Sequence, residues 1–130
     1  MIVLDASAAL EWLLQTPTGV RVEQRLLQPR ETIHAPHLLD LEIAQALRKC
    51  VAAGWVAATE AEEALADLAD TKLTRYPHHL FLPRVWELRG NLTAYDAIYV
   101  ALAEELSSPL ITCDEKLRRS AGHDARIEKI

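Results

Sequence analysis

The sequence predicts an α/β fold, a three-layer α/β/α sandwich around a central parallel sheet. Short apolar segments alternate with longer segments whose apolar residues recur at helical spacing, an order typical of a parallel sheet with helices on both faces. The chain has 130 residues, the length of one domain, and 50% of them are hydrophobic, so it can bury a core without disulfide or metal cross-links. We therefore expect a single domain over residues 1–130.

The first half of the chain is predicted to hold two strands and three helices. The run Ile2-Val3-Leu4 is too short for a helix and is β-branched at its centre, which favours a buried strand. Pro36 suits the first turn of a helix, because the amide proton that proline lacks would have no partner there. In order, the expected elements are a strand at 1–4, helices at 7–14 and 20–27, a strand at 32–35, and a helix from Pro36 to about Gly54.

Two threonines mark the starts of helices in the second half. Thr59 is the expected N-cap of a helix at 60–68, with Glu62 three residues later completing a capping box. Thr93 is expected to cap the most apolar helix of the chain, at 94–106. The other elements are a strand at 72–75, a helix at 82–89 that ends at Gly90, a strand at 109–112, a polar helix at 114–119 and a strand at 125–130.

The cysteines and the N-terminal residues indicate where the protein works. Cys50 and Cys113 lie far apart and form no Cys-x-x-Cys motif, which is typical of a reduced, cytosolic protein. The opening apolar run is short and has no basic leader, so neither a signal peptide nor a membrane span is expected. We therefore expect a cytoplasmic protein that does not contact a membrane.

The net charge leaves the function open. Fourteen Lys and Arg residues and 19 Asp and Glu residues give a formal charge of −5, which weighs against nucleic-acid binding because phosphate affinity comes mainly from basic side chains. Arginine is locally dense, however, as at Arg118-Arg119, and an acidic cluster that holds Mg²⁺ loses much of its apparent charge. A negative charge also fits a protein that works beside a basic partner.

Two aspartates directly follow predicted strands. Asp5 follows the first strand, and Asp114 follows the strand at 109–112. Ligand sites of open α/β sheets lie beyond the carboxyl ends of the strands, so both carboxylates would meet at one edge if these strands are neighbours. Each residue also stands where a helix begins, and aspartate is a favoured N-cap. For each of them a capping role and a site role are both open.

Asp96 is the one charge near the start of the most apolar helix. The stretch from Ala94 to Ala103 is apolar on nearly every face, which is the pattern of a buried helix. A carboxylate there has little access to solvent, and an unpaired buried carboxylate is strongly unfavourable. A capping box with Thr93 is the alternative explanation, and it does not exclude a site at the same helix end.

The helix after the second strand carries two acidic residues, Asp40 and Glu42. They lie about 200° apart around a helix, so only one is expected to face the sheet edge. Apolar residues within a turn of Glu42 favour it slightly, but spacing alone does not decide between them.

Carboxylates gathered in this way need a cation. The four side chains would repel one another unless some stay protonated or a metal compensates. Oxygen-only ligands select hard ions such as Mg²⁺ or Mn²⁺ over zinc, and the five histidines show no metal-binding spacing. A carboxylate-held Mg²⁺ suits the hydrolysis of phosphodiesters.

The segments around these carboxylates resemble the PIN domain family and, within it, the VapC-type toxins of bacterial toxin–antitoxin pairs. They occur in the family's order and spacing over essentially the whole chain, and the Tyr-Asp-Ala-x-Tyr segment with the later Thr-x-Asp is the most specific of them. The matching segments are 2–8, 35–47, 92–104 and 109–117; the segment 59–86 matches only loosely.

The resemblance implies a sheet of strand order 3-2-1-4-5 and an endoribonuclease that depends on Mg²⁺ or Mn²⁺ and acts on RNA. It also implies a homodimer and a cognate antitoxin whose basic C-terminal segment inhibits the enzyme. By position, the implied catalytic residues are Asp5, Glu42, Asp96 and Asp114. Of these, Asp5, Asp96 and Asp114 would hold the metal, and the hydroxyls of Ser7 and Thr112 would support them.

Three other interpretations compete with this one. A haloacid-dehalogenase-like phosphatase also places an aspartate after its first strand, but it needs a second aspartate two residues on, where Ser7 stands. A phospho-receiver module needs an acidic pair, an acceptor aspartate and a lysine after particular strands, and none is evident there. A non-catalytic PIN-like interaction module would normally lack one of the carboxylates, and this chain has all four.

Overall fold

The computed structural model describes all residues 1–130 and contains one five-stranded sheet. Every pairing is parallel and the strand order is β3-β2-β1-β4-β5, which confirms the expected fold class and order. The strands are β1 (Ile2–Leu4), β2 (Ile33–Pro36), β3 (Leu73–Tyr76), β4 (Leu110–Thr112) and β5 (Ile127–Lys129). The central strand β1 is fully buried, because helices cover both of its faces.

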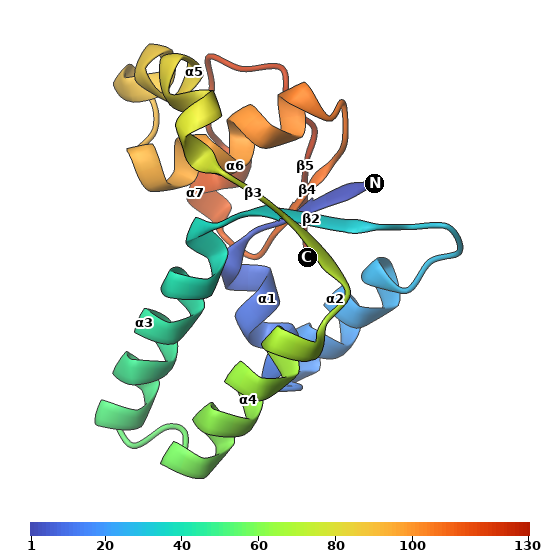
Figure 1. Cartoon of the computed structure of the whole chain (residues 1–130), viewed down its shortest axis with the longest axis vertical. Helices are drawn as coiled ribbons and strands as arrows, with labels where there is room; N and C mark the ends of the chain where they lie inside the picture. The colour runs from blue at the N-terminus through green and yellow to red at the C-terminus, as the bar shows by residue number, and fades with distance from the viewer.

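Helices form the two outer layers of the sandwich (Figure 1). One layer contains α1 (Ala6–Leu13), α2 (Pro17–Leu26), α3 (Leu38–Ala52) and α4 (Ala58–Asp70), with α3 and α4 projecting from the sheet as a long hairpin. The other layer contains α5 (Leu82–Glu87) and α6 (Ala94–Glu105), and the short α7 (Glu115–Arg118) packs beside β5. Two 3₁₀ turns, His78–Phe81 and Leu88–Gly90, flank α5.

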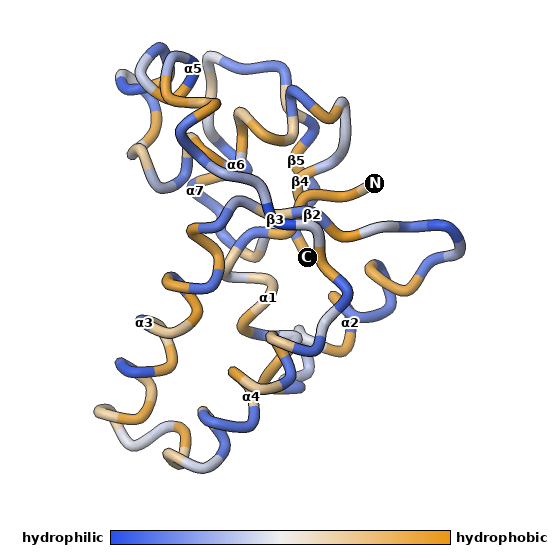
Figure 2. Tube along the Cα trace, viewed as in Figure 1, coloured by the Kyte–Doolittle hydropathy of each residue, from blue (hydrophilic) through white to orange (hydrophobic).

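Helix α6 is the centre of the second layer. Its residues 97–103 are all buried, and it packs on β1, β2 and β4. The hydropathy colouring shows apolar residues along β1 and polar residues in the loop between α2 and β2 (Figure 2). Thr93 caps this helix as expected, its hydroxyl oxygen accepting from the Asp96 amide at 3.2 Å. The start of α6 is therefore fixed beside the sheet, with Asp96 in its first turn.

Two local predictions are wrong. Pro36 is the last residue of β2, aligned with Tyr76 of β3, and the helix begins only at Leu38. Proline has no amide proton to donate, but the pairing with β3 uses the next amide, that of His37, which donates to the Tyr76 carbonyl at 2.9 Å. Thr59 caps no helix, since α4 starts one residue earlier and its N-cap position is Ala57, which has no side chain able to cap.

Neither cysteine forms a disulfide. No helix combines the length and the apolar character that crossing a membrane would require.

Candidate metal and catalytic site

Asp5 lies directly after β1 and is held by two hydroxyls. Only 6% of it is exposed, and its Oδ2 accepts hydrogen bonds from Ser7 Oγ at 2.6 Å and Thr112 Oγ1 at 2.7 Å. Each hydroxyl has one proton, so both are fully used as donors to this oxygen. The same hydroxyl oxygens accept from the amides of Cys113 at 2.9 Å and Asp114 at 3.0 Å. Asp5 does not cap α1 through its side chain, so the capping explanation for this residue is wrong.

Asp114 reaches the same edge of the sheet because β1 and β4 are neighbours. Leu4 aligns with Ile111, and the Asp5 amide donates to the Ile111 carbonyl at 3.0 Å, so both aspartates follow the carboxyl ends of adjacent strands. Asp114 also caps α7, its Oδ1 accepting from the Lys116 amide at 2.8 Å. The cap uses one carboxylate oxygen, and Oδ2 has no hydrogen-bond partner within the chain.

The structure separates the two acidic residues of α3. Asp40 turns toward β3, where Arg75 holds it in a two-pronged ion pair, Nε to Oδ2 at 2.8 Å and Nη2 to Oδ1 at 2.9 Å. Glu42 instead faces α6, and its Oε1 accepts from the Tyr99 hydroxyl at 2.6 Å. Glu42, and not Asp40, is therefore the carboxylate of α3 that lies near Asp5 and Asp96.

The pKa values of two of these carboxyls show that the four form one electrostatic group. Burial raises the pKa of Glu42, which the Tyr99 hydrogen bond lowers and the charges of Asp5 and Asp96 raise further. Burial also raises the pKa of Asp96, and the charges of Asp5 and then Asp114 add to the rise. Asp5 acts on both neighbours, so it lies at the electrostatic centre of the group.

Cations do not neutralise this group. Ten ion pairs occur in the protein, and none of them involves Asp5, Glu42, Asp96 or Asp114. The hydrogen bond with Thr93 and then the charge of Lys116 lower the pKa of Asp96, but burial and the neighbouring carboxylates outweigh them. An acidic group without a paired cation is the environment that a bound divalent ion would stabilise.

The donor chemistry of the group fits a hard divalent ion. All candidate ligand atoms are carboxylate oxygens, which suit Mg²⁺ or Mn²⁺. No three Asp, Glu, His or Cys side chains are grouped so that they could hold a metal ion together. The group therefore offers oxygen donors of the kind that Mg²⁺ or Mn²⁺ prefers, but it is not an assembled set of metal ligands.

Tyr99 is a residue of the acidic group's surroundings to which the sequence analysis assigned no role. Its side chain is fully buried, and burial raises the pKa of its hydroxyl, so the group stays protonated and donates to Glu42. A buried tyrosine needs a partner for its hydroxyl, and Tyr99 lies three residues after Asp96, on the same helix face. The position of Tyr99 in the sequence therefore indicates that its hydroxyl has a hydrogen-bond partner near Asp96.

The raised pKa values predict a pH-dependent gain in stability when Asp96 is replaced by Asn in metal-free protein. The folded state holds the Asp96 proton more tightly than the unfolded chain, so wild type loses stability as pH rises from the ordinary value of 3.8 through the raised folded pKa. Asn has no such proton to lose. We expect the variant to melt a few degrees above wild type at pH 7, with the difference vanishing at pH 3.

Thermal melts in chelator at a series of pH values measure this difference. Carboxyls whose pKa values are lowered, such as Glu104 and Glu128, also make stability depend on pH. Their contribution is the same in the two proteins, so it cancels in the difference between the two melting temperatures. A constant difference across the range would contradict the repulsion that we describe.

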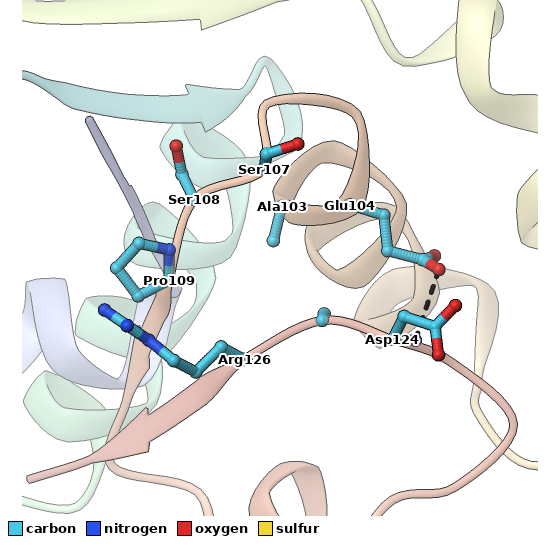
Figure 3. A pocket seen from close by; sticks show the side chains of 8 residues that line it. Ala103, Glu104, Ser107, Ser108, Pro109, Asp124 and Arg126 are labelled. Carbon is cyan, nitrogen blue, oxygen red and sulfur yellow. Dashed lines mark hydrogen bonds between the residues drawn. The ribbon is translucent and has the colours of Figure 1, made fainter.

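A surface hollow of about 590 Å³ lies at the end of the sheet opposite to the acidic group. Figure 3 shows the residues that line it. Pro109 and Arg126 line it, and they directly precede β4 and β5, so it opens at the amino ends of these strands. One of its two carboxylates, Glu104, accepts from the Asp124 amide at 3.3 Å and pairs with Arg84 at 3.0 Å. Because it opens at the amino ends of the strands, this hollow is separate from the acidic group.

The chain matches a known protein family over most of its length. The model of the PIN domain family matches residues 2–122. Ribonuclease VapC12 of Mycobacterium tuberculosis is 43% identical over 130 residues, which make up 100% of this chain and 99% of that protein. Ribonuclease VapC9 of the same organism is 44% identical over 117 residues, covering 90% of this chain and 88% of that protein.

Two solved structures share the fold. VapBC2 from Rickettsia felis, bound to a DNA fragment from its promoter, matches with a TM-score of 0.71 at 17% identity, covering 99% of this chain and 98% of that chain. PAE2754 from Pyrobaculum aerophilum matches with a TM-score of 0.63 at 26% identity, covering 89% of this chain and 81% of that chain.

Proposed function

Because the chain belongs to the PIN domain family and, within it, to the VapC-type proteins, we propose that it is a metal-dependent endoribonuclease and the toxin of a toxin–antitoxin pair. The observation that carries the proposal is the gathering of Asp5, Glu42, Asp96 and Asp114 at one sheet edge without a paired cation. Two relatives that are at least 43% identical are named ribonucleases. The proposed reaction is hydrolysis of RNA phosphodiester bonds.

In this proposal Asp5, Asp96 and Asp114 hold Mg²⁺ or Mn²⁺. A bound ion would supply an activated water and would stabilise the leaving oxygen. Ser7 and Thr112 fix Asp5 Oδ2, which leaves Oδ1 as the oxygen available to the ion. Asp114 offers Oδ2, since its Oδ1 caps α7.

Glu42 has a different role, that of proton acceptor. Tyr99 holds its Oε1, so Oε2 is free to accept a proton from the attacking water. The raised pKa of Glu42 lies closer to neutral pH than that of an ordinary glutamate, which improves the carboxylate as a general base. Tyr99 is a positioning residue, because it acts only through Glu42.

A cleavage assay tests the proposed function. The purified protein is incubated with transfer, ribosomal and messenger RNA in the presence of Mg²⁺, Mn²⁺ or chelator. We expect internal cuts with either ion and none with chelator. If no RNA is cut with either ion, the chain is instead a non-catalytic member of its family.

We also propose a small partner protein whose basic C-terminal segment places an arginine against Asp5, Asp96 and Asp114. A guanidinium pairs bidentately with a carboxylate, and it would compensate the charge that the chain leaves unpaired. The arginine would compete with the metal, so we expect inhibition to weaken as Mn²⁺ rises and as salt rises.

A competition titration measures this effect. The inhibition constant of the partner is determined at increasing Mn²⁺ with RNA cleavage as the readout. A constant value would mean that the partner covers the path of the RNA and leaves the metal in place.

The proposed assembly is a homodimer. Trp55, in the turn after α3, is 80% exposed, which suits a contact surface. Trp12 contributes less, because it packs on the core and its indole N–H donates to Glu23 at 3.2 Å. Light scattering at tens of micromolar distinguishes a dimer from a monomer.

A further inference from the structure

A surface hollow of about 610 Å³ begins at the proposed active site and runs along α3. Glu42 forms part of its wall, and Gln45, Ala46 and Lys49 continue the wall on the same helix. These positions are three, four and seven residues beyond Glu42, so they share one face of the helix. Lys49 lies roughly 10 Å along the axis from Glu42, at 1.5 Å per residue. The hollow is therefore continuous with the acidic group at one end and basic at the other.

Tyr95 of α6 forms the facing side of this hollow. It directly precedes Asp96 and is 63% exposed, whereas Tyr99, one turn further on, is fully buried. Tyr95 and Leu38 also line a second, apolar hollow of about 150 Å³, so the tyrosine stands between two depressions. An exposed aromatic ring next to a catalytic carboxylate is placed to stack on a base of the substrate.

The remaining lining chemistry matches a nucleotide. Leu38 and the 71% exposed Leu41 provide an apolar surface against which a base can lie. Gln45 has both a donor and an acceptor, as reading the edge of a base requires. Lys49 is exposed and makes no ion pair, so its charge is available to a phosphate, whereas Arg84 and Arg118 are paired with carboxylates.

We propose that this hollow binds one nucleotide of single-stranded RNA beside the cleaved bond, with Tyr95 stacking on its base, Gln45 contacting the base edge and Lys49 contacting a phosphate. The inference rests on the proposed ribonuclease function and adds to it the residues that select the substrate. Unstacked bases of single-stranded regions are the usual targets of sequence-specific RNA recognition. Base preference is therefore set by α3 and Tyr95 and is separable from the acidic group.

Steady-state kinetics on short single-stranded oligoribonucleotides, varied in base on each side of the cut, test the inference. Tyr95→Ala should raise KM about 10-fold, the size of one lost stacking interaction, with kcat within two-fold of wild type. The same variant should also lose the preference for a particular base at one nucleotide position beside the cut. Tyr95→Phe keeps the ring and should behave as wild type. Lys49→Gln should reduce the slope of log affinity against log salt by about 0.7, the loss of one phosphate contact.

Trp86→Ala is the matched control. Trp86 is also an exposed aromatic residue, 68% exposed, but it lies on α5 outside both hollows, so its loss should leave KM and base preference unchanged. If wild type cuts RNA and Tyr95→Ala has wild-type KM and preference, the inference is wrong and the proposed function stands. The inference is equally wrong if the variant weakens only the binding of the protein partner. If wild type cuts no RNA, the proposed function fails, and this inference fails with it.

Discussion

Asp5→Asn and Asp96→Asn should each reduce RNA cleavage by at least about 100-fold while the chain stays folded. Loss of groups that merely support metal ligands costs roughly 10- to 100-fold in metal affinity or activity, and loss of a ligand should cost at least as much. Asn at position 5 keeps an oxygen for the hydroxyls of Ser7 and Thr112, so the local hydrogen bonds survive. Initial cleavage rates at saturating Mn²⁺, with circular dichroism melts, measure both effects.

Asp40→Asn is the matched control for these variants. Asp40 lies two residues before Glu42 on α3, but Arg75 neutralises it. Its replacement should leave cleavage near the wild-type rate and lower stability by no more than about 1 kcal/mol, because the ion pair is partly exposed. If Asp5→Asn or Asp96→Asn cuts RNA at a rate similar to that of Asp40→Asn, the assignment of the site is wrong.

Thr112→Val should reduce both stability and cleavage, although it changes neither a proposed metal ligand nor the size of the side chain. Thr112 is fully buried, and its hydroxyl donates to Asp5 and accepts from the Asp114 amide. Valine leaves the Asp114 amide without this partner and leaves Asp5 Oδ2 with the Ser7 hydroxyl alone, at a cost of about 2 kcal/mol in the free energy of unfolding. Because the two carboxylates lose their orientation together, we expect cleavage to fall roughly 10- to 100-fold.

Thr112→Ser separates the hydroxyl from the packing of the methyl group. Serine keeps both hydrogen bonds, so cleavage should stay near wild type even if the small cavity lowers stability by about 1 kcal/mol. Urea unfolding and cleavage rates of the two variants are compared. Equal activity of the valine variant and wild type would show that Asp5 needs no hydroxyl support.

Features that depend on neighbouring residues could be predicted from the sequence. The cap at Thr93 depends on a residue three positions away, and the apolar pattern after it identifies the buried helix α6. Alternating strands and helices gave the fold class, because a parallel sheet requires crossovers. The strand order came from the family resemblance and could not be obtained from these patterns.

Features that depend on distant residues could not be predicted. The choice of Glu42 over Asp40 is made by Arg75, 35 residues beyond Asp40, and by Tyr99, 57 residues beyond Glu42. Pro36 extends β2 because β3 is its neighbour. Thr59 had the right local sequence for a cap, but α4 already includes it, so the local signal did not set the helix start.

The central claim is that Asp5, Asp96 and Asp114 together hold one site for a divalent ion, although no three such side chains are grouped as metal ligands in the absence of the ion. Mn²⁺ binding followed by electron paramagnetic resonance tests it most directly, in wild type and in the three single Asp→Asn variants, with Asp40→Asn as control. We predict that wild type and the control bind Mn²⁺ with equal affinity, and that each site variant binds at least about 10-fold more weakly. Equal Mn²⁺ affinity in all five proteins, or no binding by wild type, would contradict the claim.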